Sequence, residues 1–305
     1  DLYLAENDFR NGLATLREAA TLFPEHPDTP AMARTMTDAF ARLYLEGGAE
    51  RMPPLTALAL YDDFRELTPP GARGNEMIQR LADRLVSVDL LDRAANLLDR
   101  QVKFRLEGVE KARIGARLAL IRLLDRRPEA AVGALDESAV PGIPVELARE
   151  RNRLRARAQF DLGNPDQAIA LLQPDTSREA DLLRADILWR QQNWGGAADV
   201  FARLADPLAD KRDLTEREAT LVLNWAISAS MSENTPMVVL IRQNFAQAMD
   251  DTRFREAFRL ITNTTSGDLN DLRTLTQRFQ EVERFQSFLS DYRERLKASQ
   301  LSAIN

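Results

Sequence analysis

The sequence predicts an all-α fold, an α-solenoid built from antiparallel helix pairs. A recurring pattern carries this prediction: the first residue of a helix, an Ala three positions later and a large residue four positions beyond it. The Ala falls at residues 57, 94, 131 and 168, a constant step of 37 residues, and a constant step indicates a repeat protein. The composition agrees, because the 13 Gly and 14 Pro of the 305-residue chain cluster at expected turns rather than inside apolar runs.

In the first half of the chain, apolar residues at helical spacing alternate with Pro and Gly breaks. Pro24 ends the first helical stretch, Gly47-Gly48 ends the second, and Pro69-Pro70 closes the third, because both residue types terminate helices. Each helix is expected to pack against its neighbour in sequence. The helices expected here cover residues 1–23 with a break near residue 6, then 31–46, 53–67, 73–87, 90–105, 108–125 and 128–137.

The second half of the chain continues the pattern after a Pro- and Gly-rich break at 141–144. The helices expected here cover residues 145–162, 165–173, 178–192, 194–205, 214–232, 236–249, 251–261 and 268–298. In the last and longest of them, apolar residues recur in steps of three and four, as in coiled coils. We interpret residues 1–250 as one solenoid whose first repeat is truncated, and 251–305 as C-terminal capping helices. Docking to a partner or self-association is the alternative role for the last helix.

Composition excludes several classes of function. A net charge of −6 disfavours broad nucleic-acid binding, including RNA binding, because phosphates require a basic surface. With no Cys and one His, the chain cannot form a disulfide, a Cys-ligated metal site or a multi-His metal site. That residue, His26, lies in a Pro-rich turn where exposure to solvent is expected. We therefore expect no catalytic residue, no metal and no cofactor.

Targeting signals are absent from the sequence as it stands. No apolar run reaches the roughly 18 residues that a membrane-spanning helix needs, and no signal peptide is visible. The chain begins at Asp1, midway through an expected first helix, so we expect a longer protein whose upstream part could carry a signal or anchor. The absence of Cys favours the bacterial periplasm or another envelope location over the cytoplasm.

The helix-pair pattern resembles the tetratricopeptide repeat family. Three segments carry the resemblance: Leu162-Gly163-Asn164-Pro165 with Ala168 and Leu172, Asn193-Trp194 with Ala197 and Phe201, and Phe9, Leu16, Ala19 and Pro24. Two features depart from the family, since Pro replaces the usual aromatic residue at 128 and 165, and the step of 37 exceeds the usual length of about 34 residues. The resemblance implies a right-handed superhelix whose first helices line a concave groove, and a binding scaffold without catalytic activity.

Two arginine ladders are the candidate partner-binding residues. Arg149, Arg153 and Arg157 follow one another at i+4 spacing, as do Arg113 and Arg117, so each set lies on one face of its helix. Arginine binds carboxylates through two parallel hydrogen bonds, which favours an acidic peptide or a free C-terminal carboxylate as the ligand. The alternative is a solvated face on which the arginines form simple ion pairs with neighbouring carboxylates.

Trp189 is the sixth candidate, as an aromatic anchor on the groove side, with core packing as the alternative. The predicted function is a non-catalytic protein-interaction scaffold that binds a partner protein or peptide in its groove, in a bacterial envelope-associated assembly. The alternative function is a helical accessory region of a larger enzyme, such as a lytic transglycosylase.

Overall fold

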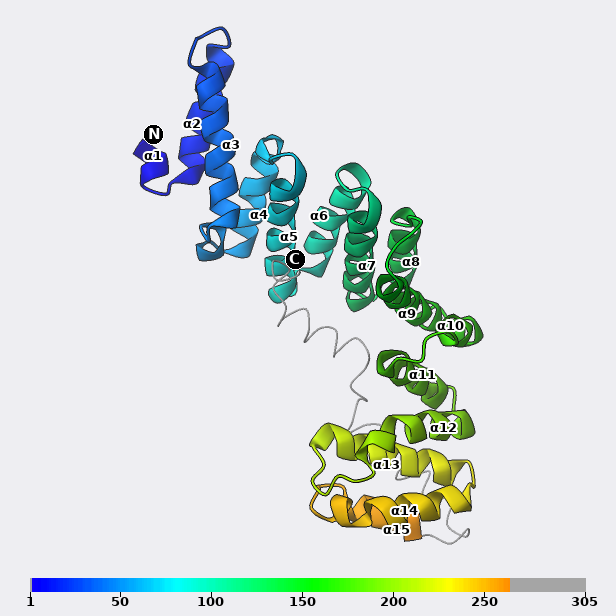
Figure 1. Cartoon of the computed structure of the whole chain (residues 1–305). Helices are drawn as coiled ribbons and strands as arrows, with labels where there is room; N and C mark the ends of the chain where they lie inside the picture. The colour runs from blue at the N-terminus through cyan, green and yellow to red at the C-terminus, as the bar shows by residue number, and fades with distance from the viewer. Residues whose placement is uncertain (1, 264–305) are drawn as a thin grey trace. The chain divides into compact units, whose positions relative to one another are not determined.

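The computed structural model describes residues 2–263, and its regular structure there is entirely helical. This range contains fifteen α-helices and three 3₁₀-helices and no β-strand (Figure 1), which confirms the predicted all-α class. Each predicted helix up to residue 261 is present, with ends within four residues of the prediction. The predicted long helix over 268–298 lies outside the described residues.

The described chain forms two compact units, 2–148 and 149–263, and their boundary falls inside α9. Unit 1 contains α1 (Leu2–Ala5), α2 (Phe9–Leu22), α3 (Thr29–Leu45), α4 (Pro54–Asp63), α5 (Gly71–Ser87), α6 (Leu91–Phe104), α7 (Gly108–Leu124), α8 (Pro128–Glu137) and the first turn of α9 (Val145–Asp161). Unit 2 contains the rest of α9, α10 (Pro165–Leu172), α11 (Arg178–Arg190), α12 (Trp194–Ala205), α13 (Glu216–Met231), α14 (Thr235–Asp250) and α15 (Arg255–Asn263). The predicted domain boundary at residue 250 stays a prediction, because most of 251–305 is outside the described residues.

Helix boundaries repeat with the period that the Ala positions predict. The second helices α4, α6, α8 and α10 begin at residues 54, 91, 128 and 165, and the first helices α5, α7 and α9 begin at 71, 108 and 145. Each of these three first helices is 17 residues long. The recurring Ala is the fourth residue of its second helix each time, and Ala57, Ala94, Ala131 and Ala168 have no exposed surface. A residue without a bulky side chain lets the packed helices approach closely at these points.

The turn inside six helix pairs has the same backbone geometry. In each, a residue two positions before the second helix has a positive φ; these residues are Asn7, Asp89, Arg126, Gly163, Gln192 and Glu233. The N–H of the next residue donates to the carbonyl five positions earlier, as from Leu90 to Leu85 at 2.8 Å and from Asn164 to Gln159 at 2.9 Å. This left-handed cap satisfies the last carbonyls of the first helix. Because the cap recurs, the chain leaves these first helices in the same way.

In unit 1, several helices that are neighbours in sequence pack together, among them the pairs α5–α6 and α7–α8 and the connection α6–α7. An aromatic cluster connects α3 with α4: the rings of Phe40 and Tyr61 stack with their centroids 6.2 Å apart, and Tyr44 meets Tyr61 edge-on. The Tyr44 hydroxyl donates to the Ala57 carbonyl at 2.7 Å. The predicted contact between residues 31–46 and 53–67 is therefore present.

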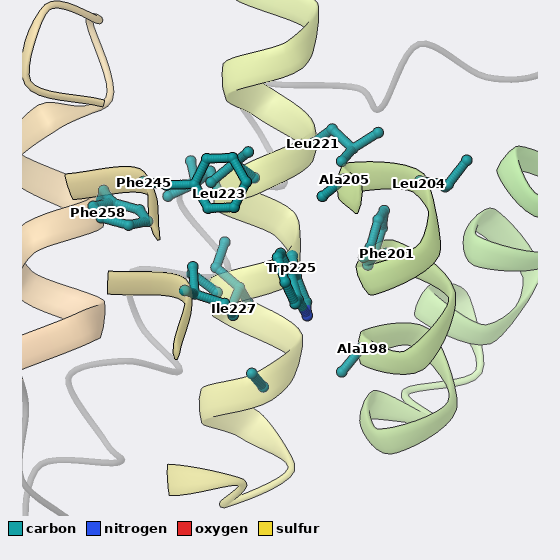
Figure 2. Packing of buried hydrophobic residues seen from close by; sticks show 14 of the residues in the cluster. Ala198, Phe201, Leu204, Ala205, Leu221, Leu223, Trp225, Ile227, Phe245 and Phe258 are labelled. Atoms are coloured by element: carbon teal, nitrogen blue, oxygen red, sulfur yellow. The ribbon is translucent and has the colours of Figure 1, made fainter. Parts of the chain in front are cut away.

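In unit 2, α13 is the central helix of the core (Figure 2). Every residue from Leu221 to Ala229 is buried, because α12, α14 and α15 all pack against this helix. Trp225 is 6% exposed and meets the ring of Phe245 edge-on, with 6.1 Å between centroids. The N-terminus of α13 is closed by a capping box in which the Thr215 hydroxyl and the Glu218 carboxylate each bind the other's backbone N–H.

Candidate interaction surface

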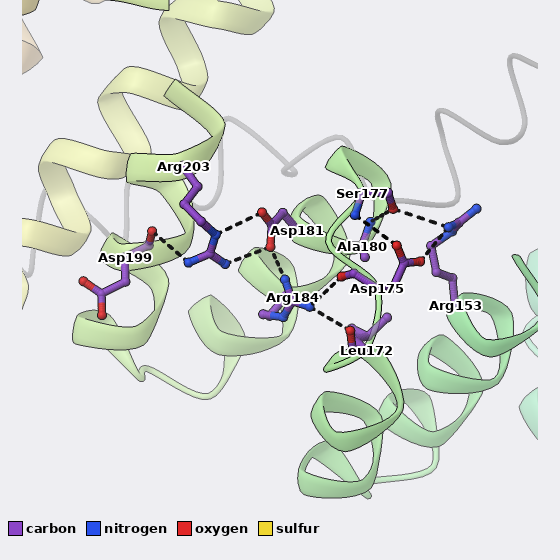
Figure 3. A network of polar contacts seen from close by, with 9 residues as sticks. All are labelled: Arg153, Leu172, Asp175, Ser177, Ala180, Asp181, Arg184, Asp199 and Arg203. Atoms are coloured by element: carbon purple, nitrogen blue, oxygen red, sulfur yellow. Dashed lines mark hydrogen bonds and ion pairs between the residues drawn. The ribbon is translucent and has the colours of Figure 1, made fainter. Parts of the chain in front are cut away.

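Two of the candidate arginines on α9 form ion pairs inside unit 2. The Arg153 guanidinium donates to Asp175 at 2.7 Å and to the Ser177 hydroxyl at 3.4 Å (Figure 3). The paired side chains of Arg153 and Asp175 are only 10% and 5% exposed. Burial raises the pKa of the Asp175 carboxyl, but the hydrogen bonds from Ser177 and the Arg153 charge outweigh burial, so this pKa lies below its ordinary value.

Arg157 reaches α11 in the same manner. Its guanidinium donates to Asp186 at 2.9 Å and to Asp161, one turn further along α9, at 3.0 Å. The side chains of Arg157 and Asp186 are 7% and 2% exposed. The other oxygen of Asp186 accepts from Arg190 at 2.9 Å. The Asp186 carboxylate thus connects α11 to α9.

Asp181 makes the corresponding connection from α11 to the following helix. Its carboxylate accepts two hydrogen bonds from Arg203 of α12, at 2.8 and 3.1 Å, and one from Arg184 of its own helix (Figure 3). The hydrogen bond with Asp181 raises the pKa of the Arg203 guanidinium above its ordinary value. Arg184 also donates to the carbonyls of Leu172, the last residue of α10, and Asp175 in the following loop. These hydrogen bonds hold the loop between α10 and α11 against α11.

These carboxylates are the polar residues that sequence reasoning missed. Asp181 and Asp186 lie among buried apolar positions of α11, between Ala180, Leu183 and Ile187. A carboxylate at a core position of an amphipathic helix needs a charged partner, because an unpaired buried charge is costly. That signal was available in the sequence, but the identity of the partner depends on the fold.

The remaining candidates differ in exposure. Arg149 is half-buried on α9 in unit 2. In unit 1, Arg117 of α7 pairs with Asp83 of α5 and is 12% exposed, so it connects two first helices. Arg113 is 50% exposed and pairs with Glu110 of its own helix at 3.1 Å. Arg113 is therefore the candidate arginine whose guanidinium faces solvent, and within residues 2–263 its ion pair is a local one on its own helix. Exposed pairs of this kind contribute little to stability.

Trp189 packs against other aromatic side chains in unit 2. It is half-buried, and its ring meets Trp194 and Phe201 edge-on, with centroids 5.1 and 6.0 Å away. Such edge-to-face contacts stabilise a core. The position agrees with the core alternative for Trp189 rather than with a fully exposed anchor.

Polar contacts also run along the first helices of unit 1. Asp38 of α3 lies 3.8 Å from Arg73 of α5, and Arg80 of α5 donates to the Leu45 carbonyl at the end of α3 at 2.6 Å. Gln79 of α5 donates to Glu110 of α7 at 3.4 Å. We call the surface that these contacts follow the first-helix face of unit 1; it comprises Asp38, Arg73, Glu76, Gln79, Arg80, Asp83, Glu110, Arg113 and Arg117.

No metal-binding or membrane-spanning feature occurs in the part of the chain that the structure describes. Within residues 2–263 there is no group of three or more His, Asp or Glu side chains placed to hold a metal ion. The same range contains no helix with the length and hydropathy needed to cross a bilayer. His26 lies in the turn between α2 and α3, with a side chain 55% exposed. No protein-family model matches the chain, and a search of curated proteins finds no match.

Proposed function

We propose that the protein is a tetratricopeptide-like α-solenoid that acts as a non-catalytic scaffold and binds a partner protein or peptide along its first helices. The observation that carries the proposal is the regular step of the helix starts, at 54, 91, 128 and 165 for second helices and at 71, 108 and 145 for first helices. Helix pairs that start at a constant step and share the same turn, as α5–α6, α7–α8 and α9–α10 do, favour stacking in a right-handed superhelix, in which each pair buries its apolar side on the next. An envelope-associated assembly is the proposed setting, on the strength of the Cys-free composition.

Ion pairs between successive first helices, one partly buried and one buried, support the role of a scaffold. Arg117 with Asp83 connects α7 to α5 in unit 1, and Arg157 with Asp186 connects α11 to α9 in unit 2. We infer that these two pairs fix the register of the first helices, because breaking a buried pair by removing one partner is costly. A fixed register keeps the remaining polar side chains of the first helices at constant spacing. Such preorganisation favours binding of a partner, because fewer side chains have to be ordered when the complex forms.

The experiment is affinity capture with two matched charge variants. In the first, Arg113→Glu changes an exposed residue of α7, a first helix; in the second, Arg93→Glu changes an exposed residue of α6, a second helix. We expect that a partner captured by the unchanged chain is lost with Arg113→Glu and retained with Arg93→Glu. Loss with Arg93→Glu alone would contradict binding along the first helices. Turnover of peptidoglycan by the purified chain would contradict a non-catalytic function.

A further inference from the structure

Helices α9 and α11 carry charged residues at a position that is apolar in other first helices. Equivalent positions follow by counting back from the left-handed turn residue after each first helix. Eight residues before it, α5, α7 and α13 have the buried side chains of Leu81, Leu118 and Trp225. At the same position α9 has Arg155 and α11 has Arg184. A position of the apolar core is therefore charged in these two helices.

A second equivalent position, six residues before the turn residue, shows the same replacement. In α7 and α13 it holds the buried side chains of Leu120 and Ile227. In α9 and α11 it holds Arg157 and Asp186, whose side chains pair at 2.9 Å. Helix α5 also has a charge here, Asp83, but keeps an apolar residue at the first position. Of the described first helices from α5 to α13, only α9 and α11 are charged at both positions.

The apolar core of unit 2 begins at α11. Its cluster extends from Ala185 of α11 to Ile261 of α15 and, among the described residues, includes no side chain of α9 or α10 (Figure 2). In unit 2, the buried apolar residues of α9 and α10 are small or few: Leu154, Ala156, Ala158, Ala168 and Leu172. Polar contacts connect these two helices to α11 and the loop before it: Arg153 with Asp175, Arg157 with Asp186, and Arg184 with the Leu172 carbonyl.

Apolar and charged contacts differ in what their separation costs. Separating two apolar faces exposes hydrocarbon to water, which is unfavourable in proportion to the exposed area. Separating a buried ion pair loses the attraction between the charges but returns both groups to water, and these two terms largely cancel. The contact between α9 and α11 therefore resists opening less than an apolar contact of the same size.

From this replacement of apolar by charged contacts we propose that the α9–α10 pair opens from α11 as a local unit, while the core of α11 to α15 stays folded. Regions with few buried apolar contacts open at a lower free energy than the rest of a protein. Opening releases the register that Arg157 and Asp186 set, and so provides the chain with a hinge at α9. The hinge is a property of the chain alone, goes beyond the proposed scaffold function and requires no partner.

The test is amide hydrogen exchange of the full chain, followed by mass spectrometry. It compares the amides of 149–161 in α9 with those of 112–124 in α7, the equivalent residues, and with those of 220–231 in α13. We expect the α9 amides to exchange at least about tenfold faster than both other sets. Low concentrations of urea should change the α9 exchange little and speed the α13 exchange steeply, because a local opening exposes less surface than global unfolding.

The variant Arg157→Met/Asp186→Leu restores apolar side chains at the second position and is expected to slow the α9 exchange to within about threefold of that in α7. The matched control, Arg113→Met/Glu110→Leu, removes the same two charges from an exposed pair of α7 and is expected to leave the α9 exchange unchanged. Circular dichroism verifies that each variant is folded.

Three results would overturn the inference: α9 amides that exchange as slowly as those of α13, the same urea dependence in α9 and α13, or an α9 exchange that the Arg157→Met/Asp186→Leu variant does not slow. The first two are measured on the unchanged chain, so they decide the question even if that variant does not fold.

Discussion

Arg157 of α9 and Asp186 of α11 form a buried ion pair, with 2.9 Å between guanidinium nitrogen and carboxylate oxygen and side chains 7% and 2% exposed. The sequence motif that indicated a ligand-binding ladder on α9 thus includes an arginine that holds two helices together. A buried pair of this kind is costly to break, since removing one partner leaves the other charged and desolvated.

Asp186→Ala is expected to lower the free energy of unfolding by about 3 kcal/mol, because Arg157 then loses its partner in α11. Replacing both residues, as in Arg157→Met/Asp186→Leu, is expected to recover much of that loss, since apolar side chains of similar volume leave no buried charge between α9 and α11. Urea unfolding followed by circular dichroism measures both. The control is Glu110→Ala, which breaks the exposed pair with Arg113 and is expected to cost less than about 1 kcal/mol. Equal costs for Asp186→Ala and Glu110→Ala would contradict the structural role of the buried pair.

Gly115→Ala tests the close approach of α7 to the end of α8. A Cβ at Gly115 would lie 1.8 Å from the Ser138 hydroxyl oxygen and 2.1 Å from the Ser138 Cβ, and Ser138 is fully buried. We expect a loss of about 2 kcal/mol or more, because the two helices must separate. The control is Gly133→Ala in α8, where nothing lies within 4 Å of the new Cβ; this change is expected to stabilise by up to about 1 kcal/mol. Thermal unfolding of the two variants distinguishes them, and a neutral Gly115→Ala would contradict the packing of α7 on α8.

Asp175 predicts a pH-dependent contribution to stability in unit 2. Its folded-state pKa lies below the ordinary value of 3.8, so the unfolded chain binds this proton more readily than the folded chain does. The contribution is therefore fully present above the unfolded pKa and is lost as the pH falls through the folded pKa. Asp175→Asn should be less stable than the unchanged chain at pH 7, and the difference should shrink as the pH falls below about 4. A difference that stays constant from pH 7 to pH 3 would contradict ionisation of Asp175 as its origin.

Trp189 is expected to contribute to stability more than to partner binding. Its ring contacts Trp194 and Phe201, and Trp189→Ala removes both contacts and leaves a cavity. We expect a loss of about 2–3 kcal/mol, below the cost for a fully buried Trp because the side chain is half-buried. Chemical denaturation gives the stability, and the capture assay gives the binding. Unchanged stability together with lost capture would identify Trp189 as a binding anchor instead.

The helices and the buried Ala positions could be predicted from the sequence because they depend on local pattern. Periodic apolar residues, Pro at the start of α4, α8 and α10, and the step of 37 residues are all visible in the chain. The left-handed turn residues were less visible, since Gly163 is the single Gly among the six and Arg126 and Gln192 are not typical of that conformation. The packing of the helices on either side of the turn offsets the conformational cost of a positive φ at these non-Gly residues.

The partners of the candidate arginines could not be predicted in the same way. Asp175 is 22 residues from Arg153 and Asp186 is 29 residues from Arg157, so each pairing depends on how two helix pairs pack. The ladder of Arg149, Arg153 and Arg157 was visible as a charged stripe, but spacing within a helix does not tell whether the stripe faces solvent or another helix.

The stacking of helix pairs in unit 1 is tested most directly by distances between spin labels at equivalent positions. Thr56, Arg93 and Ala130 are each the third residue of a second helix, are exposed, and are separated by 37 residues. Because the chain has no native Cys, Thr56→Cys, Arg93→Cys and Ala130→Cys can be labelled in pairs and measured by double electron–electron resonance. A solenoid predicts similar distances for 56–93 and 93–130 and a clearly longer distance for 56–130. A 56–130 distance no longer than the other two would contradict the solenoid.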